Sequence, residues 1–168
     1  RLNIGGGFAA HRAGTAPDLD RVFAVISDTV SRTFGATMPS LICEPGRAMV
    51  AESFALSTRV KRLRGSDTVF LNDGIYGGLA DLRDMTLPDR VRVFSPSGEQ
   101  RSATARARVV FGPTCDSLDR IPDGLSLPGD MAVGDYVVFD AMGAYSLAMS
   151  TAFNGYGLRE VVSVQSLR

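Results

Sequence analysis

The stretch LNIGGGF, at residues 2–8, indicates how this chain begins to fold. A short apolar run, of the kind that forms a buried strand, leads directly into three consecutive glycines, Gly5, Gly6 and Gly7. Because glycine has no Cβ atom, such a turn lets an anion approach the backbone N–H groups closely. The stretch therefore predicts a strand that ends in a tight turn. The glycines alone leave two functions open for this turn, which are phosphate binding and simple chain reversal.

The segment after the glycines is predicted to form an amphipathic helix from Ala16 to Phe34. Thr15 is a candidate N-cap residue, and Gly35 follows the last predicted turn, where glycine commonly ends a helix. The prediction depends on apolar residues that recur at helical spacing. These residues are Leu19, Val22, Phe23, Ile26, Val30 and Phe34.

A second strand is predicted from Leu41 to Cys43, and it ends at Pro45 and Gly46 in the stretch SLICEPGR. Strand, glycine turn, helix and strand make a βαβ unit, which implies a parallel sheet with ligands at the carboxyl ends of its strands. One βαβ unit cannot cover both faces of its own sheet. We therefore expect residues 1–50 to be the last part of a larger α/β domain.

After Ala51 the pattern changes to alternating apolar and polar residues, which is typical of antiparallel strands. The alternating or strand-like runs are residues 54–65, 68–73, 90–94, 103–112 and 136–140, and the segment REVVSVQS closes the chain. Turn residues separate them at Gly65–Ser66, Ser95–Glu99 and Gly134–Asp135. Residues 51–168 are thus predicted to be a β-rich domain, and the predicted fold class is α/β plus all-β.

The composition excludes several classes of partner. Eighteen basic residues balance 18 acidic residues, so no basic surface for nucleic acid or for a charged membrane is predicted. No apolar run approaches the ~20 residues of a membrane span. Two cysteines, Cys43 and Cys115, are too few for a disulfide framework, which favours reduced thiols. We expect a cytoplasmic protein, and we predict no metal site.

Two charged side chains follow the second predicted strand, in the loop EPGR. The planar guanidinium group of Arg47 suits a phosphate group, and Glu44 could pair with a cationic ring nitrogen. The alternative is an ordinary surface salt bridge at a turn. Because this loop and the triglycine turn both end parallel strands, their convergence on one ligand favours a binding function more than either motif does alone.

Two loops of the β-rich part carry further candidates. Asp73 follows an apolar strand in NDGIYGG, where the alternative is a common turn residue. Cys115 and Asp116 follow a Gly-Pro break in FGPTCDSLD. This thiol could donate a proton and this carboxylate could bind a substrate ammonium group. Alternatively, the pair is a small buried residue beside a loop aspartate.

The segment DAMGAYSLAMSTAFNGYG adds aromatic candidates. Tyr145 could donate a hydrogen bond to a phosphate group, and Phe153 with Asn154 could line a pocket, although aromatic residues more often belong to a core. His11 is the lone histidine, and its polar surroundings favour a solvated loop residue over a catalyst.

In their order along the chain, LNIGGGF, EPGR, NDGIYGG, GPTCDSLD, GAY and FNG closely resemble the fold-type III pyridoxal-phosphate decarboxylases. This family includes the ornithine, lysine, arginine and diaminopimelate decarboxylases and has an alanine-racemase-like architecture. The six motifs span most of the chain, and CDSLD is most similar to the ornithine form. The resemblance implies that residues 1–50 are the C-terminal part of an incomplete (β/α)8 barrel. An antiparallel β-domain of residues 51–168 would follow it.

The resemblance also implies a role for each candidate residue. The cofactor would be pyridoxal 5'-phosphate, with Glu44 facing its pyridine nitrogen. The cofactor-phosphate loops would comprise Gly5, Gly6, Gly7, Gly46, Arg47 and Tyr145. The substrate would meet Asp73 and Asp116 at its distal ammonium group, Cys115 near its carboxylate and α-carbon, and Phe153 at the closing side of the pocket.

The function that the resemblance implies is decarboxylation of an ornithine-like basic amino acid to a diamine in polyamine biosynthesis. In this family the Cys-Asp loop reaches into the neighbouring subunit's site, which implies a head-to-tail homodimer. The lysine that forms an imine with the cofactor would lie in the missing N-terminal barrel segment. Lys61 does not replace it, because it lies in an alternating strand and not in the family's lysine motif. We therefore expect this chain alone to be inactive.

Two alternatives and one departure accompany this resemblance. The protein could instead be a non-catalytic relative that regulates or binds a partner, or a lysine- or diaminopimelate-type decarboxylase. The intact phosphate and cysteine motifs favour the enzyme. Asn3 stands where the family often has aspartate, and the polar insertion Ala10–Ala16 is a further difference; neither is expected to abolish cofactor binding.

Overall fold

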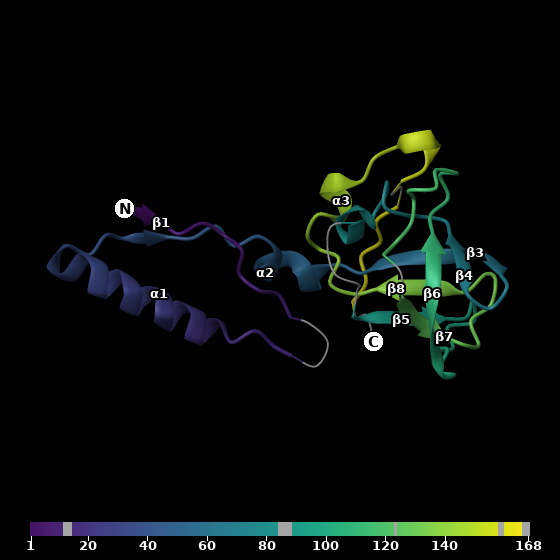
Figure 1. The fold of residues 1–168 in the computed structure, drawn as a ribbon, viewed down its shortest axis with the longest axis horizontal. Coiled ribbons are helices and arrows are strands. Elements are labelled where there is room, and N and C mark those ends of the chain that lie inside the picture. Colours follow the sequence, from purple (N-terminus) through teal and green to yellow (C-terminus); the bar gives the residue numbers. More distant parts are fainter. Residues whose placement is uncertain (12–14, 84–88, 123, 158–159, 166–168) are drawn as a thin grey trace. The chain divides into compact units, whose positions relative to one another are not determined.

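The computed structural model describes every residue except 12–14, 84–88, 123, 158–159 and 166–168. The chain forms two compact units (Figure 1). Unit 1 comprises Arg1–Ala55 and Asp140–Ala144, and unit 2 comprises Leu56–Phe139 and Tyr145–Arg168. Nothing in the sequence pattern indicates that residues 140–144 return to unit 1. Part of the polar insertion Ala10–Ala16 lies outside the described residues.

Unit 1 contains the predicted βαβ unit. Strand β1 (Leu2–Asn3) pairs in parallel with β2 (Leu41–Ile42), and helix α1 (Leu19–Phe34) lies between them in sequence. Gly35 ends α1 with a φ of 52° and donates its backbone N–H to the Ser31 carbonyl. The predicted end of the helix is therefore confirmed.

The start of α1 differs from the prediction. The helix begins at Leu19 and not at Ala16, and Asp18 is its N-cap, because the Asp18 carboxylate accepts the backbone N–H of Arg21 at 2.9 Å. Thr15 and Asp18 are both suitable N-cap residues. Pro17 decides between them, since a proline disfavours the helical conformation of the residue before it.

Apolar side chains of unit 1 remain partly exposed. Val30 is the buried residue of α1, and the ring of Phe23 lies against that of Phe8, with 5.3 Å between ring centroids. Several large apolar side chains of the βαβ unit are exposed, namely Val22, Val25, Phe34, Leu41 and Ile42. A pair of short strands with one helix has too few elements to cover these surfaces.

The rest of unit 1 consists of short turns of helix. These are η1 (Gly35–Thr37), α2 (Arg47–Val50) and η2 (Ala51–Ser53). Residues 140–144 pack against the last of them, because Gly143 donates its backbone N–H to the Ala51 carbonyl at 3.1 Å. A Cβ atom on Gly143 would lie 1.7 Å from the carbonyl oxygen of Val50, so this approach requires glycine.

Unit 2 is built on a six-stranded sheet with the strand order β5-β8-β3-β4-β6-β7 (Figure 1). Its strands are β3 (Leu56–Arg64), β4 (Thr68–Leu71), β5 (Val91–Phe94), β6 (Ala105–Phe111), β7 (Leu125–Pro128) and β8 (Tyr136–Phe139). Alternate residues of these strands face one side and form the core. The most deeply buried of them are Val60, Val69, Leu71, Val93, Val110, Leu127, Val137 and Phe139.

The prediction of a wholly antiparallel domain is wrong for one pair of strands. Within the six-stranded sheet of the described residues, β4 and β6 pair in parallel, with Phe70 opposite Phe111, and the other four strand pairs are antiparallel. The parallel pair forms because β5, which lies between them in sequence, pairs with β8 at the opposite edge of the sheet. Strand register within β3 shifts between Val60 and Arg62, and Lys61 is exposed there.

Strand β7 has no strong signal in the sequence, because its run of four residues ends in a proline. Residues 160–165, near the end of the chain, form no strand, and the side chains of Val161, Val162 and Val164 are exposed. In the described part of the chain, no helix combines the length and the apolar character needed to cross a membrane.

Candidate active site

The triglycine turn and the EPGR loop lie side by side in unit 1. Glu44 donates its backbone N–H to the Gly5 carbonyl at 2.8 Å, which continues the parallel pairing of β1 and β2. A Cβ atom on Gly6 would lie 2.5 Å from the Glu44 carbonyl oxygen. The two loops therefore meet closely because residue 6 is glycine. They lie at the carboxyl ends of the strands, where parallel sheets bind their ligands.

The backbone around Gly5 and Gly7 suits a bound anion. These glycines have φ values of 72° and 81°, and a Cβ atom on either would have no heavy atom within 4 Å. Left-handed glycines in a turn can aim successive N–H groups at one point. Arg47, at the start of α2, follows Gly46 in the adjoining loop and is half-buried. This arrangement fits a phosphate group.

Asn3 connects the two loops through its side-chain amide. The amide nitrogen donates a hydrogen bond to Glu44 Oε1, and the amide oxygen accepts the backbone N–H of Gly5 at 2.9 Å. One side chain therefore fixes both the carboxylate predicted to face a ring nitrogen and the first residue of the predicted phosphate turn. The sequence comparison with the family marks Asn3 only as a departure and gives no sign of this contact.

In unit 2, the buried carboxylate of Asp119 joins the NDGIYGG and GPTCDSLD loops. Its oxygens accept the Ile75 backbone N–H at 2.9 Å, the Thr114 N–H at 3.1 Å and the Thr114 hydroxyl at 2.7 Å. The residue is only 1% exposed. Cβ atoms on Gly74 and Gly112 would lie 2.1 and 2.3 Å from Asp119 oxygens, so both neighbours must be glycine.

Asp73 is engaged by its own loop. Its carboxylate accepts the backbone N–H groups of Gly74 and Gly78, each at 2.9 Å, and the residue is 7% exposed. Burial raises the pKa of the Asp73 carboxyl above its ordinary value, although these two hydrogen bonds oppose the shift. Each oxygen accepts one of these bonds and keeps a further lone pair, so the predicted contact between Asp73 and a substrate ammonium group stays a prediction. The same two bonds show that Asp73 also organises the turn, and this role is compatible with substrate contact.

Asp116 has the opposite environment. Its carboxylate accepts the hydroxyl proton of Tyr76 at 2.6 Å and the backbone N–H of Leu118 at 2.9 Å. The Tyr76 hydroxyl, with a smaller effect of the Leu118 N–H, lowers the pKa of Asp116 below its ordinary value. The residue is half-buried, and the lowered pKa favours its ionised form. A cationic substrate group can therefore approach a carboxylate whose position is already fixed.

Cys115 precedes this carboxylate and is exposed. Its φ of 58° lies in the left-handed region, which residues with a side chain rarely adopt. Tyr145 and Asn154 share this feature, with φ values of 65° and 51°. Left-handed residues other than glycine tend to cluster at functional sites, where neighbouring contacts hold them.

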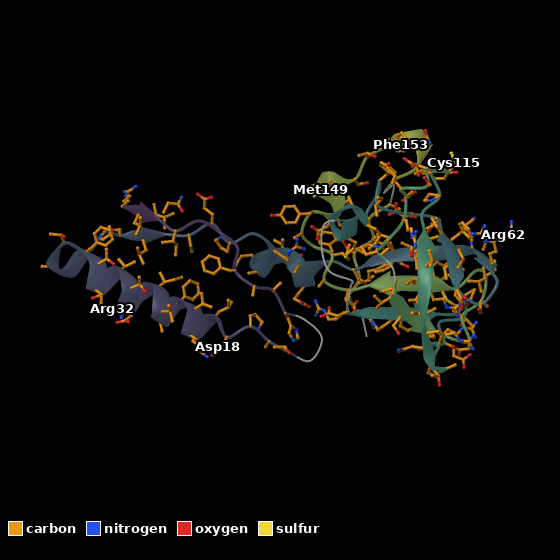
Figure 2. All side chains as sticks on the ribbon, in the orientation of Figure 1. Asp18, Arg32, Arg62, Cys115, Met149 and Phe153 are labelled. Atoms are coloured by element: carbon orange, nitrogen blue, oxygen red, sulfur yellow. The ribbon has the colours of Figure 1, made fainter. Side chains whose placement is uncertain are left out.

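Phe153 lies beside the same loops. It begins η4 (Phe153–Gly155), and its ring packs on that of Tyr76 with 4.6 Å between centroids. Figure 2 shows Phe153 and Cys115 at one end of unit 2. Tyr145 precedes helix α3 (Ser146–Met149) and is 48% exposed. That Tyr145 binds the same phosphate group as the triglycine turn stays a prediction.

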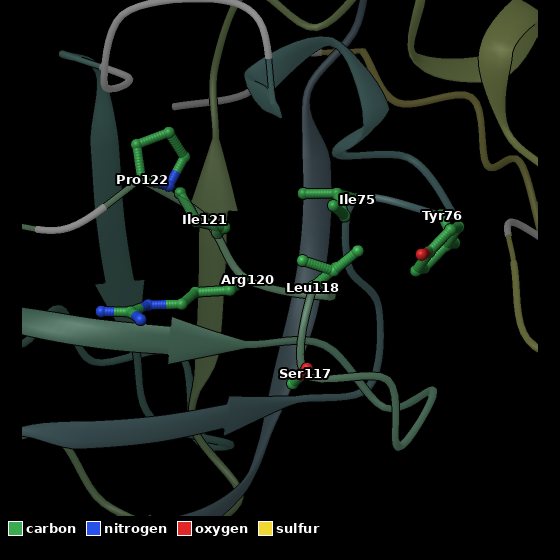
Figure 3. Close-up of a pocket in the computed structure, with 7 residues that line it drawn as sticks. All are labelled: Ile75, Tyr76, Ser117, Leu118, Arg120, Ile121 and Pro122. Carbon is green, nitrogen blue, oxygen red and sulfur yellow. The ribbon is translucent and has the colours of Figure 1, made fainter.

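An open hollow lies next to these loops (Figure 3). Its lining residues are Ile75, Tyr76, Ser117, Leu118, Arg120, Ile121 and Pro122. Leu118 is 70% exposed and lies two residues from Asp116. The hollow and the exposed leucine give the Cys-Asp loop a surface that another protein segment can contact.

The sequence therefore identifies the loops better than the contacts within them. Tyr76, Asp119 and Asn154 act through partners that are distant in sequence, and no spacing rule predicts those partners. The signal for Tyr76 was its position inside NDGIYGG, and for Asp119 its position at the end of GPTCDSLD. His11 is exposed in a segment without regular structure, as expected of a loop residue.

Comparisons with known proteins match this domain to one family. A family model described as "Pyridoxal-dependent decarboxylase, C-terminal sheet domain" matches residues 18–143. Among curated relatives, ornithine decarboxylase of Rattus norvegicus is 31% identical over an alignment that covers 98% of this chain and 39% of that protein. Antizyme inhibitor 2 of Xenopus laevis is 32% identical over an alignment that covers 92% of this chain and 37% of that protein. The chain thus spans about two fifths of the length of these relatives.

Solved structures of related enzymes share the fold. The arginine decarboxylase of Paramecium bursaria Chlorella virus, bound to agmatine, has a TM-score of 0.75 and 28% identity, over 94% of this chain and 42% of that one. The lysine/ornithine decarboxylase of Vibrio vulnificus, complexed with cadaverine, has a TM-score of 0.73 and 29% identity, over 95% of this chain and 44% of that one.

Proposed function

This chain belongs to the pyridoxal-dependent decarboxylase family through its C-terminal sheet domain, and from this membership we propose that the whole protein decarboxylates ornithine or a close basic amino acid. The product would be a diamine, as in polyamine biosynthesis. The observation that carries the choice of a basic substrate is the Asp116 carboxylate, which the Tyr76 hydroxyl holds in position and whose ionised form this hydrogen bond favours. The distal ammonium group of the substrate would pair with it.

Unit 1 would hold the cofactor. The N–H groups of the triglycine turn, with Gly46 and Arg47, would bind the phosphate of pyridoxal phosphate, and Tyr145 would add a hydrogen bond from its hydroxyl. Glu44, oriented by Asn3, would face the pyridine nitrogen and keep it protonated. When bound, the cofactor supplies an electron sink for the electron pair that the leaving carboxylate group releases. Cys115 would return a proton to the α-carbon of the substrate.

The exposed apolar residues of unit 1 support its assignment to the end of a (β/α)8 barrel. The remaining barrel elements would cover Leu41, Ile42 and the apolar side of α1. They would also supply the lysine that binds the cofactor, since Lys61 is an exposed residue at the irregular point of β3. This chain by itself would then not decarboxylate its substrate.

A head-to-tail homodimer would complete each site. The Cys115–Asp116 loop, the exposed Leu118 and the 43% exposed Phe153 offer an outward surface for this purpose. In such a dimer each cofactor site would receive the Cys-Asp loop of the other subunit, so that the substrate meets groups from both.

The test is a product assay on the full-length protein that contains this chain. Carbon dioxide release and amine products are measured with ornithine, lysine, arginine and diaminopimelate, and ornithine should give the highest kcat/KM. The variant Asp116→Asn should raise KM for ornithine by roughly tenfold or more, because a charged hydrogen bond is lost. The matched control is Asp67→Asn in the β3–β4 turn, which should keep the parent KM. Equal KM values for Asp116→Asn and the parent would contradict the pairing of Asp116 with the substrate ammonium group.

A second candidate is a non-catalytic regulatory protein that binds a partner. The observation in favour of this candidate is the similarity to antizyme inhibitor 2, which is as similar to the chain as the ornithine decarboxylases are. A full-length protein that shows no cofactor-dependent visible absorbance and releases no carbon dioxide from any of the four substrates would support this candidate over the enzyme.

A further inference from the structure

We infer that Asn154 is a positioning residue that holds the backbone of Thr114 and Cys115, and thereby fixes the thiol in place for its part in the reaction. The inference rests on the proposed function, in which Cys115 donates a proton to the substrate. It adds a residue from a third segment of the chain to the two loops described above.

The contact that carries the inference is a hydrogen bond from the Asn154 side chain. Its amide nitrogen, Nδ2, donates to the Thr114 carbonyl oxygen at 2.9 Å and lies 4.0 Å from the sulfur of Cys115. On its other side, Thr114 donates both its backbone N–H and its hydroxyl proton to the Asp119 carboxylate. Thr114, the residue before Cys115, is therefore held through its carbonyl by Asn154 and through its N–H and hydroxyl by Asp119.

Cys115 depends on these hydrogen bonds to Thr114 because of its own backbone conformation. Its φ of 58° is unfavourable for a residue with a side chain, so the loop would relax if its neighbours did not hold it. Rotation about the N–Cα bond of Cys115 would move its sulfur atom away from its present position. Asn154 contributes the bond nearest to the thiol, whereas Asp119 acts from the buried side of the loop.

Asn154 is itself fixed by the segment around it. Thr151 donates both its backbone N–H and its hydroxyl to the Tyr76 carbonyl, each at 2.8 Å, and the Phe153 ring packs on that of Tyr76. Tyr76 in turn donates its hydroxyl proton to Asp116. Two separate hydrogen bonds therefore position the two side chains. Tyr76 holds the Asp116 carboxylate, and Asn154 holds the backbone next to the Cys115 thiol.

This division of anchors predicts separate kinetic effects. Loss of the Asn154 amide should lower kcat, because the proton donor is displaced, and should leave KM for ornithine within about twofold, because Tyr76 still holds Asp116. A displacement of the reacting group lowers a rate by roughly tenfold to hundredfold. The variant Asp116→Asn should show the opposite pattern, with its main effect on KM.

Two variants separate the amide from the backbone. Asn154→Gly removes the side chain but suits the positive φ of 51° at this position, so the turn itself is not strained. Asn154→Asp keeps the size of the side chain but turns an acceptor toward the Thr114 carbonyl. Both should lower kcat, and thermal unfolding should confirm that both are folded. The matched control is Asn72→Asp, whose side-chain oxygen can still accept the Arg59 N–H.

A second readout needs neither cofactor nor substrate. In the apo protein, iodoacetamide labels the exposed thiols Cys115 and Cys43, and Cys43 in unit 1 serves as the internal reference. Asn154→Gly should raise the rate of Cys115 labelling relative to Cys43 by roughly threefold, because one hydrogen bond that restrains the loop is lost. The Asn72→Asp control should keep the parent ratio.

The outcomes distinguish this inference from the proposed function. If the labelling ratio changes as expected while the parent protein decarboxylates no substrate, the proposed function fails and the positioning of the thiol by Asn154 stands. If the parent is active and both Asn154 variants keep its kcat and its labelling ratio, the inference is overturned. A rise in KM as large as the fall in kcat would overturn it too, since Asp116 would then have moved with the thiol.

Discussion

At the scale of single residues, the Tyr76 hydroxyl determines how Asp116 ionises. This hydrogen bond lowers the pKa of Asp116 below its ordinary value of 3.8. A carboxyl whose pKa is lower in the folded than in the unfolded chain contributes stability above the unfolded value, and this contribution is lost as the pH falls through the folded value. The contact should therefore stabilise the fold at neutral pH and lose its effect in acid.

The variant Tyr76→Phe tests this pH dependence. It should lower the free energy of unfolding at pH 7 and have a smaller effect near pH 3, because the unfolded chain then binds a proton that the folded parent must release to keep the hydrogen bond to an ionised Asp116. Chemical denaturation at a series of pH values measures the difference. Tyr136→Phe on β8 is the control, because the Tyr136 ring lies beneath Arg59 and should give a difference that does not depend on pH in this range. A Tyr76→Phe effect that is equal at both pH values would exclude the hydrogen bond to Asp116 as its cause.

Asn3 offers a second test at this scale. Asn3→Ala removes the donor to Glu44 and the acceptor for Gly5, whereas Asn3→Asp keeps the acceptor alone. Affinity for pyridoxal phosphate should fall in the order parent, Asp variant, Ala variant, with a total loss of roughly fivefold to tenfold, which corresponds to about one hydrogen bond. Titration of the full-length apo protein with the cofactor measures it. If the alanine variant binds as tightly as the parent, the bridge through Asn3 has no part in cofactor binding.

At the scale of elements, the loop after β4 depends on its glycines. A Cβ atom on Gly77 would lie 1.8 Å from Asp73 Oδ1, in a site where the carboxylate is buried. Gly77→Ala should therefore destabilise the chain by about 2–3 kcal/mol, the upper part of the range of about 1–3 kcal/mol for an overpacked interior. In the β3–β4 turn, Gly65 has a φ of 61° and open space around it, so Gly65→Ala should cost only about 1 kcal/mol of backbone strain. Equilibrium unfolding of both variants compares them, and a smaller effect at Gly77 than at Gly65 would contradict the packing argument.

The elements also show what can be predicted from sequence. The end of α1 follows from Gly35, and β3 and β6 follow from their alternation, because these features depend on neighbours in sequence. The start of α1 required a choice between two suitable caps, which Pro17 decides. The parallel pairing of β4 with β6 depends on where β5 goes, and no local pattern contains that information. In the site, the meeting of the two unit 1 loops follows from βαβ geometry, whereas the contacts of Asp119 with Ile75 and Thr114 join two loops that no local pattern connects.

At the scale of the whole molecule, the proposed dimer makes a prediction about mixtures. Two inactive full-length variants, Arg47→Ala and Asp116→Ala, carry their defects in different loops. If each site combines the cofactor loops of one subunit with the Cys-Asp loop of the other, mixed dimers contain one site with both loops intact. Mixing the two proteins under conditions that exchange subunits should restore up to about a quarter of the parent activity by random association. A mixture as inactive as its components, with exchange verified, would contradict shared sites.

Asp119 has a consequence for how such a protein can change over generations. Its carboxylate, with Gly74 and Gly112 packed against it, leaves almost no freedom at the base of the two loops, whereas Ser117 and Leu118 at the tip are exposed. If the Cys115–Asp116 loop contacts the substrate as proposed, mutations at Ser117 and Leu118 could alter which molecules bind without disturbing the buried contacts of Asp119. New selectivity can therefore arise from a few surface substitutions, while the buried base is inherited unaltered.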